Sequence, residues 1–293
     1  MVLLCIYLVA VTISCGLSAS HFGETKAAIV ITLAGTKKLS EYFEWSCRSI
    51  GNAAPLYDML VFHESNSKVM ELKCAPNVKL IDLGEDGLSG LIASRFVGVE
   101  VHEKEKYGAI HSALKTVLLH VPRLLVEIKP MTGHIFNQWL VPYSHWTYSD
   151  PDIIWGNLHD WVSQSEMNEY DIITLAKTLD AGRLFIRGQF ALHKNEPGPN
   201  KLWEGLKYLE ITKFAEALGA AIRMIHDKLH ADAVYNHCFH SAEGWYSTVV
   251  FKSGLSVKII GRGLDDFSRN PVIMFNNQLI RCPISEKVSL AGC

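Results

Sequence analysis

Short apolar runs rich in β-branched residues alternate along this chain with stretches whose apolar residues recur at helical spacing. This pattern predicts strands at Ala27–Leu33, Leu56–His63, Val78–Leu83, Asp171–Leu175 and Leu184–His193. Helices are predicted within Thr36–Ile50, His102–Arg123 and Lys201–His230. Such alternation is typical of an α/β fold with a parallel sheet, which binds ligands at the carboxyl ends of its strands.

A further strand is predicted at the aromatic residues Trp146 and Tyr148, directly before Asp150, Pro151 and Asp152. Pro151 has no N–H for a β-ladder, so the strand must end there or lie at an edge. Two carboxylates in an apolar setting need a cation, and Mg²⁺ or Mn²⁺ takes one or two carboxylates together with phosphate oxygens. Asp-Pro-Asp is also a good surface turn, so the tripeptide alone leaves both interpretations open.

Composition narrows the class of protein. The chain has 293 residues, of which 48% are hydrophobic and 20% are charged, and its formal net charge is −2. This is enough apolar material for a large core, and the scattered basic residues argue against a nucleic-acid partner. No Gly-x-Ser-x-Gly, His-Glu-x-x-His or phosphate-loop motif occurs, which argues against esterases, zinc proteases and P-loop enzymes.

The N-terminal segment predicts a secretory location. Residues Met1 to Leu17 are almost wholly apolar and are followed by small residues at 18–20, as in a signal peptide, although an uncleaved membrane anchor or a buried strand would share this pattern. We therefore expect residues 1–20 to target or anchor the chain, in the Golgi or ER lumen or membrane or as a secreted protein, and residues 21–293 to form the folded domain. Five cysteines follow this segment, which allows at most two disulfides: Cys47, Cys74, Cys238, Cys282 and Cys293.

Several short motifs follow one another along the chain in an order similar to that of a known family. Lys129-Pro130, with Gly133 and Ile135-Phe136 after it, precedes the Asp-Pro-Asp segment, which is followed by Trp155-Gly156 and Tyr170-Asp171. From about Ala27 to Phe251 the chain resembles an uncharacterised family of glycosyltransferases with a GT-A-like, nucleotide-diphospho-sugar transferase fold. The resemblance implies a Rossmann-type, mixed and mainly parallel sheet flanked by helices in a single domain. The chain departs from the family pattern at His63-Glu64 and at Glu127, where an Asp is usual.

The resemblance also implies roles for particular residues. Asp150 and Asp152 would hold the metal, Mn²⁺ or Mg²⁺, with Asp152 the more direct ligand. Glu243, in a Glu-Gly-x-Tyr-Ser segment, would be the general base. The expected donor-binding residues are Asp150, Lys129, Thr32, Glu64 and Arg187. Pro130 is expected to fix an extended backbone next to Lys129.

Together these features predict a metal-dependent glycosyltransferase that moves a sugar from a nucleotide-diphosphate donor to a hydroxyl group of a glycan, glycolipid or glycoprotein. The alternative is a secreted, non-catalytic carbohydrate-binding or effector-like protein that keeps the fold. The predicted partners are thus a nucleotide sugar and a hydroxyl acceptor, with possible membrane association through the N-terminal segment.

Overall fold

A computed structural model describes residues 25–34, 41–65, 67–85, 87–97, 104–175, 184–239, 242–260, 272–275 and 278–281. The expected N-terminal signal or anchor at 1–20 lies outside these residues. None of the described helices is by itself long and apolar enough to cross a bilayer, although the helix α4 (Lys104–His120) and the segment Pro122–Ile135 reach that length and composition together, with a 117° bend between them.

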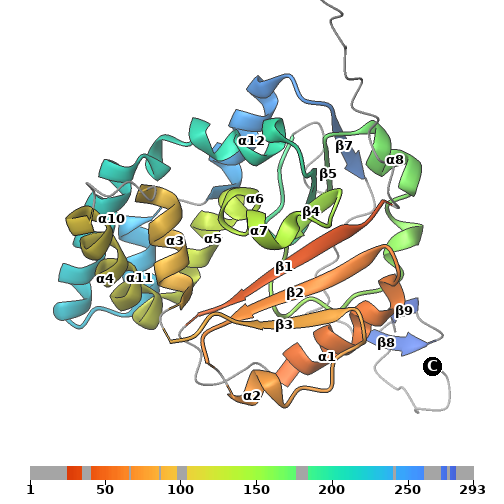
Figure 1. Cartoon of the computed structure of the whole chain (residues 1–293), viewed down its shortest axis with the longest axis horizontal. Coiled ribbons are helices and arrows are strands. Elements are labelled where there is room, and N and C mark those ends of the chain that lie inside the picture. The colour runs from red at the N-terminus through yellow and green to blue at the C-terminus, as the bar shows by residue number, and fades with distance from the viewer. Residues whose placement is uncertain are drawn as a thin grey trace, which may run out of the picture.

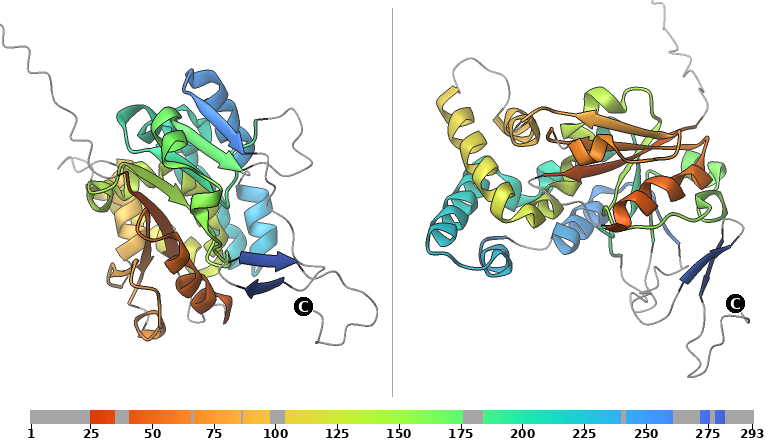
Figure 2. Two further views of the ribbon diagram at one scale, coloured as in Figure 1. Left: turned by 90° about the vertical axis from the view of Figure 1, so that its right-hand side faces the viewer. Right: turned by 90° about the horizontal axis from the view of Figure 1, so that it is seen from below.

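Seven strands form one mixed sheet in the order β3-β2-β1-β4-β6-β5-β7 (Figure 1). Their bounds are β1 Ala27–Leu33, β2 Tyr57–His63, β3 Val78–Asp82, β4 His145–Tyr148, β5 Ile172–Leu175, β6 Ala191–Lys194 and β7 Val257–Ile260. Only β6 runs against its neighbours β4 and β5, and the other pairs are parallel. The expected α/β fold with a mixed, mainly parallel sheet is confirmed. A separate hairpin joins β8 (Val272–Phe275) and β9 (Gln278–Arg281) (Figure 2).

Helices cover both faces of the sheet because its central strands are apolar on both sides. Successive side chains of a strand point to opposite faces. Ala28 and Val30 of β1 accordingly pack into one core and Ile29 and Ile31 into the other. β1 therefore reads as a continuous apolar run, as a doubly covered strand should.

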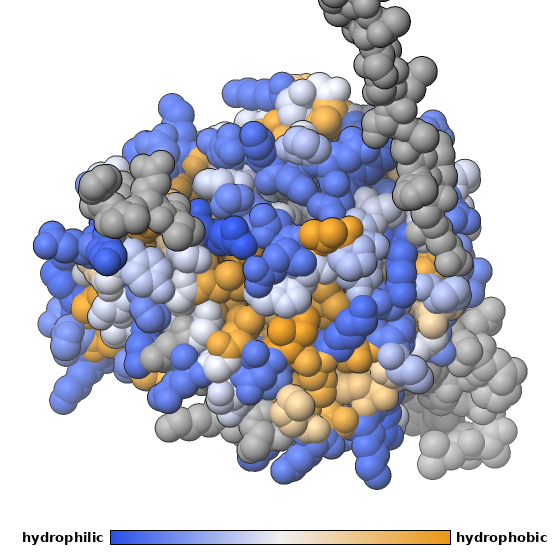
Figure 3. Space-filling view, viewed as in Figure 1, coloured by the Kyte–Doolittle hydropathy of each residue, from blue (hydrophilic) through white to orange (hydrophobic). Residues whose placement is uncertain are grey.

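The first face carries most of the helices and the larger core. The helices on this face are α3 Gly87–Val97, α4 Lys104–His120, α5 Leu125–Ile128, α6 Thr132–Ile135, α7 Asn137–Leu140, α10 Ile211–His226, α11 Ala231–Cys238 and α12 Ala242–Ser253. The short helix α9 (Pro197–Asn200) contacts α6 and β6. The second face is covered by α1 Glu41–Ser49, α2 Ser67–Met70 and α8 Gln164–Glu169. In Figure 3 hydrophilic side chains surround an apolar area over the region of β2 and β3.

Short 3₁₀ turns connect these elements: η1 Ile50–Ala53, η3 Pro122–Leu124, η4 Lys129–Met131, η5 Leu158–Asp160, η7 Leu202–Gly205 and η8 Lys207–Leu209. Two of the predicted elements differ from the structure in their bounds. The helix predicted from Lys201 begins only at Ile211, after η7 and η8. The strand predicted at Leu184–His193 is confined to Ala191–Lys194, because the backbone bends at Gly188 and Gln189.

Candidate active site

The site lies where the direction of the sheet order reverses. From β1 the chain builds β2 and β3 on one side and then returns to place β4 on the other. In open α/β sheets ligands bind at such a switch point, beside the carboxyl ends of the strands. Here β4 ends at Tyr148 and leads into Ser149 and Asp150, while β6, being antiparallel, begins at the same edge just after Gly188.

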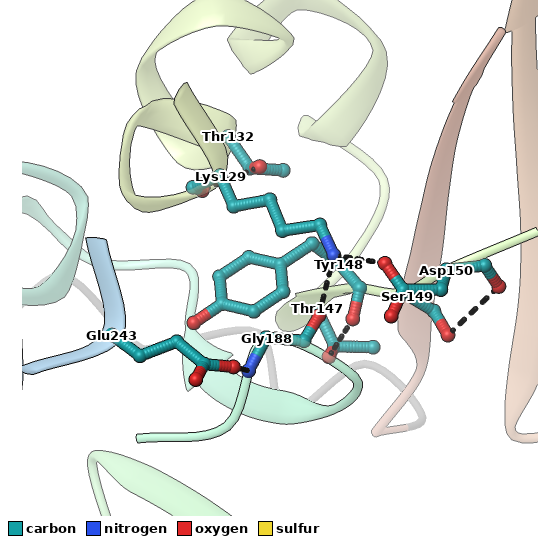
Figure 4. A network of polar contacts seen from close by, with 8 residues as sticks. All are labelled: Lys129, Thr132, Thr147, Tyr148, Ser149, Asp150, Gly188 and Glu243. Carbon is teal, nitrogen blue, oxygen red and sulfur yellow. Dashed lines mark hydrogen bonds and ion pairs between the residues drawn. The ribbon is translucent and has the colours of Figure 1, made fainter. Parts of the chain in front are cut away.

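Lys129 and Asp150 meet at this edge. The Lys129 ammonium donates a hydrogen bond to Asp150 Oδ1 and a second one, of 2.7 Å, to the Gly188 carbonyl oxygen. It also lies 5.8 Å from the centre of the Tyr148 ring (Figure 4). The Lys129 side chain is 13% exposed and that of Asp150 is 29% exposed, so the ion pair is shielded from most of the solvent. Charge-assisted bonds of this kind are stronger than neutral ones.

The backbone at Lys129 is not extended, contrary to expectation. Lys129 has φ −47° and ψ −42°, and η4 starts there with Pro130 in its first turn. A residue before proline ordinarily avoids this region. Thr132 Oγ1 donates a 2.7 Å hydrogen bond to the Lys129 carbonyl, and the side-chain bonds to Asp150 and Gly188 also hold Lys129 in place. These tertiary contacts override the local preference.

Glu243 reaches the same peptide segment from the opposite side. It lies in the first turn of α12, where the helix dipole favours a carboxylate. Its Oε1 accepts a 2.6 Å hydrogen bond from the Gly188 N–H. A Cβ atom at residue 188 would lie only 2.7 Å from Glu243 Oε1, so a larger residue there would displace the Glu243 carboxylate from this position. Gly188 thus joins a cation through its carbonyl and a carboxylate through its N–H.

Three cavities border Lys129, two of them small. One small cavity, of about 20 Å³ (the smaller cavity), is bordered by Thr32, Tyr148 and Ser149 at the ends of β1 and β4. The larger, of about 420 Å³, falls in the size range of small-molecule sites. Its lining mixes charged, amide and aromatic groups: Arg123, Val126, Lys129, Asp150, Gly188, Gln189, Tyr235, Asn236, Phe239 and Glu243. Such a lining can both hydrogen bond to hydroxyl groups and cover an apolar ring face.

Glu127 lies behind the larger cavity and is 1% exposed. Burial raises the pKa of its carboxyl to about 7, against the hydrogen bond donated by the Tyr235 hydroxyl and the charge of Arg123. The Arg123 guanidinium stacks on Tyr235 at 4.4 Å. Glu127 therefore fastens α5 to α11.

Asp152 is separated from Asp150 by the turn at Pro151 and is exposed to solvent. Within the described residues no group of three or more His, Cys, Asp or Glu side chains could hold a metal ion. From the described part of the chain, the carboxylates of Asp150 and Asp152 are the hard oxygen ligands that could hold Mn²⁺ or Mg²⁺ here. The remaining ligands would have to be phosphate oxygens and water. This donor set fits a metal that arrives with a diphosphate, and does not form a metal site without one.

Of the other expected donor-binding residues, Thr32 borders the smaller cavity together with Lys129. Glu64 follows β2 at the same edge of the sheet, but its Oε1 accepts a 2.9 Å hydrogen bond from the Leu88 N–H and so caps the start of α3. The Arg187 guanidinium stacks on Phe185 at 4.5 Å and lines neither cavity.

Several site residues were missed by the sequence interpretation. They are Gly188, Arg123, Tyr235 and Asn236. Gly188 could have been noticed, because an isolated glycine next to a strand often marks a close backbone approach. The others lie on helices where a polar residue normally faces solvent, and their sequence offers no comparable signal.

Comparison with known proteins places these residues in a family. No curated protein matches the chain. The profile of a family of unknown function, DUF6625, matches residues 29–241, which include Lys129, Asp150, Asp152 and Gly188 and end just before Glu243. Because this match covers more than half of the 293 residues, the chain belongs to the DUF6625 family of unknown function.

Proposed function

We propose that this protein is a glycosyltransferase that moves a sugar from a nucleotide-diphosphate donor to a hydroxyl acceptor, with Mn²⁺ or Mg²⁺ as cofactor. The observation that carries the proposal is the meeting of Asp150, Lys129 and Glu243 around the 420 Å³ cavity at the switch point of the sheet. The motif resemblance from Ala27 to Phe251 supports it, and so does the mixed α/β sheet.

In this proposal the donor and the acceptor bind on different sides of Lys129. The donor diphosphate would lie by Asp150 and Lys129, near the smaller cavity with Thr32 and Ser149. The metal, when bound, offsets negative charge on the leaving diphosphate. The Lys129 ammonium supplies a further positive charge there and orients the phosphate oxygens by hydrogen bonds.

The acceptor would lie in the larger cavity. Asn236 and Gln189 offer amide groups for sugar hydroxyls, and Phe239 offers an apolar ring face. Glu243, held by the Gly188 N–H, can accept the proton of the attacking hydroxyl in an inverting transfer. Asn236, Gln189 and Phe239 are neutral, which suits an uncharged sugar.

A second function is favoured by one observation. Asp150 already has a cation, Lys129, and Asp152 points into solvent. A secreted, non-catalytic carbohydrate-binding protein would keep the larger cavity and have no use for donor binding.

Thermal unfolding with added ligands separates the two functions. We expect Mn²⁺ together with one nucleoside diphosphate to raise Tm, because a ligand at about 100 times its Kd stabilises by about 2.7 kcal/mol. Asp152→Asn should reduce this rise, whereas Asp227→Asn, an exposed acid at the end of α10, should keep it. Absence of a rise with every nucleotide, alongside a rise with an oligosaccharide, would favour the non-catalytic protein. A transfer assay with the matching nucleotide sugar then tests turnover.

A further inference from the structure

Two cysteines outside the candidate site lie against each other. Cys47, in α1, is fully buried in the core under the second face of the sheet. Cys74 lies between α2 and β3, is partly exposed, and packs against the same core. Both side chains belong to one packed cluster of the core, and both are thiols in this structure.

The backbone holds this contact in place. The Ala75 N–H donates a 3.0 Å hydrogen bond to the Cys47 carbonyl, and Arg48 Nε donates one of 3.2 Å to the Lys73 carbonyl. The Asn77 side chain donates to the Ile50 carbonyl at 3.0 Å. These bonds fasten the segment 73–77 to α1 and η1 on both sides of the cysteines.

A glycine allows the same two segments to come close. A Cβ atom at Gly51 would lie 3.1 Å from the Cβ of Ala75, which is tighter than ordinary contact. The short distance between the chains is therefore built into the sequence at Gly51, and the two thiols are held in contact by the fold.

We propose that Cys47 and Cys74 form a reversible disulfide, in which Cys74 reacts first. The proposal does not depend on the glycosyltransferase assignment. It is a redox-modification site for a disulfide oxidant, either glutathione disulfide or the disulfide of a protein oxidoreductase.

The two thiols differ in reactivity. The hydrogen bond from Cys47 lowers the pKa of the Cys74 thiol, against the burial and the Glu44 charge that raise it, and the Arg48 charge adds to the lowering. The hydrogen bond with Cys74, together with burial, raises the pKa of the Cys47 thiol. Since the thiolate is the nucleophile, the partly exposed Cys74 is the attacking group.

The reaction balances in two steps. The Cys74 thiolate attacks one sulfur of glutathione disulfide, which forms a mixed disulfide and releases one glutathione. Cys47 then loses its proton and attacks Cys74 Sγ, which releases the second glutathione. The protein gives up two electrons, and the two protons end on the released glutathione thiols. Because the Cys47 thiol holds its proton tightly, the second step should be the slower one.

Peptide mapping of the full chain tests the proposal. The purified reduced protein is incubated in glutathione buffers of increasing oxidised fraction, quenched with acid, alkylated and digested with trypsin without reduction. Cleavage after Arg48 and Lys73 puts the two cysteines on separate peptides, 39–48 and 74–79, so a linked pair identifies the bond. We expect this pair to accumulate after a transient glutathione adduct on Cys74, with Tm raised by several degrees.

Two variants test the order of reaction and the specificity of the pair. Cys47→Ala should stop at the glutathione adduct on Cys74. Cys238→Ala should form the bond as the native chain does, because Cys238 contacts the sulfur of Met224 at 3.6 Å and lies in a different helix. Native protein in which Cys47 and Cys74 stay alkylatable in excess glutathione disulfide would overturn the proposal, as would linkage of either one to another cysteine instead. The native-chain map decides even where a variant does not fold.

Discussion

Replacing Lys129 by methionine tests the ion pair at the centre of the site. Methionine keeps most of the length of the side chain but removes the bonds to Asp150 and to the Gly188 carbonyl. A hydrogen bond to a charged group contributes about 1.5–3 kcal/mol, and breaking a fully buried pair costs about 3–5 kcal/mol. Asp150 is 29% exposed and can be partly hydrated in the variant. We therefore expect a loss of about 2 kcal/mol, or roughly 4–8 °C in Tm for a protein of this size.

Denaturant unfolding of Lys129→Met, Asp150→Asn and the double variant measures the loss of stability. Because the two side chains touch, the cycle should give a coupling energy of about 1–2 kcal/mol. Lys252→Met, at an exposed lysine of α12, is the matched control and should change stability by less than about 0.5 kcal/mol. Single variants as stable as the native chain, with no coupling between them, would refute the reasoning and remove the ion pair from the site.

Three further predictions concern residues near that pair. Glu243→Gln keeps an oxygen for the Gly188 N–H but removes the base, so Tm should stay close to the native value while sugar transfer falls by about 10²–10⁴-fold; an unchanged transfer rate would exclude the base. Gly188→Ala brings a Cβ within 2.7 Å of Glu243 and should cost about 1–2 kcal/mol in denaturant unfolding, with slower transfer and donor binding retained; native stability would contradict that contact. The raised Glu127 pKa, about 7 against 4.5, means that the folded state holds the proton more tightly than the unfolded state. Its contribution should be fully present below about pH 4.5 and be lost as pH rises to 7, by up to about 3 kcal/mol. Glu127→Gln should abolish this trend in unfolding measured at pH 5 and 7.5, and equal pH dependence of the two proteins would show that Glu127 ionises normally.

The sequence predicts β1 well because its pattern has one physical cause. Ala27–Leu33 is apolar throughout, and both faces of β1 are covered by helices, so the predicted and observed bounds coincide. β6 was predicted too long for the opposite reason. Leu184–Phe190 begins and ends with apolar residues, but its backbone bends at Gly188, which bonds to Lys129 and Glu243. That bend is set by side chains far away in the sequence, which no local pattern contains.

The site shows the same limit. The motif order placed Lys129, Asp150 and Glu243 in one function. Lys129 and Glu243 do meet at Gly188, and Asp150 is bonded to Lys129. The motifs could not show that Asp150 is paired with a cation of the protein itself. Its partner in the fold is a lysine 21 positions earlier, and that pairing depends on η4 adopting a helical backbone before a proline.

Gly188 bonds to Lys129 through its carbonyl and to Glu243 through its N–H, and so it sets the spacing between two opposite charges. The ammonium of Lys129 and the carboxylate of Glu243 are held to the carbonyl and the N–H of one residue, which has no side chain to rearrange. Gly188 lies just before β6, whose hydrogen bonds run to β4 on one side and β5 on the other. The two charged groups therefore share a common anchor, and moving either one away from it breaks a hydrogen bond to Gly188. Ligands of the 420 Å³ cavity meet two opposite charges spaced by a single peptide segment, so the shape of a ligand, as much as its affinity for either group, decides whether it is accepted.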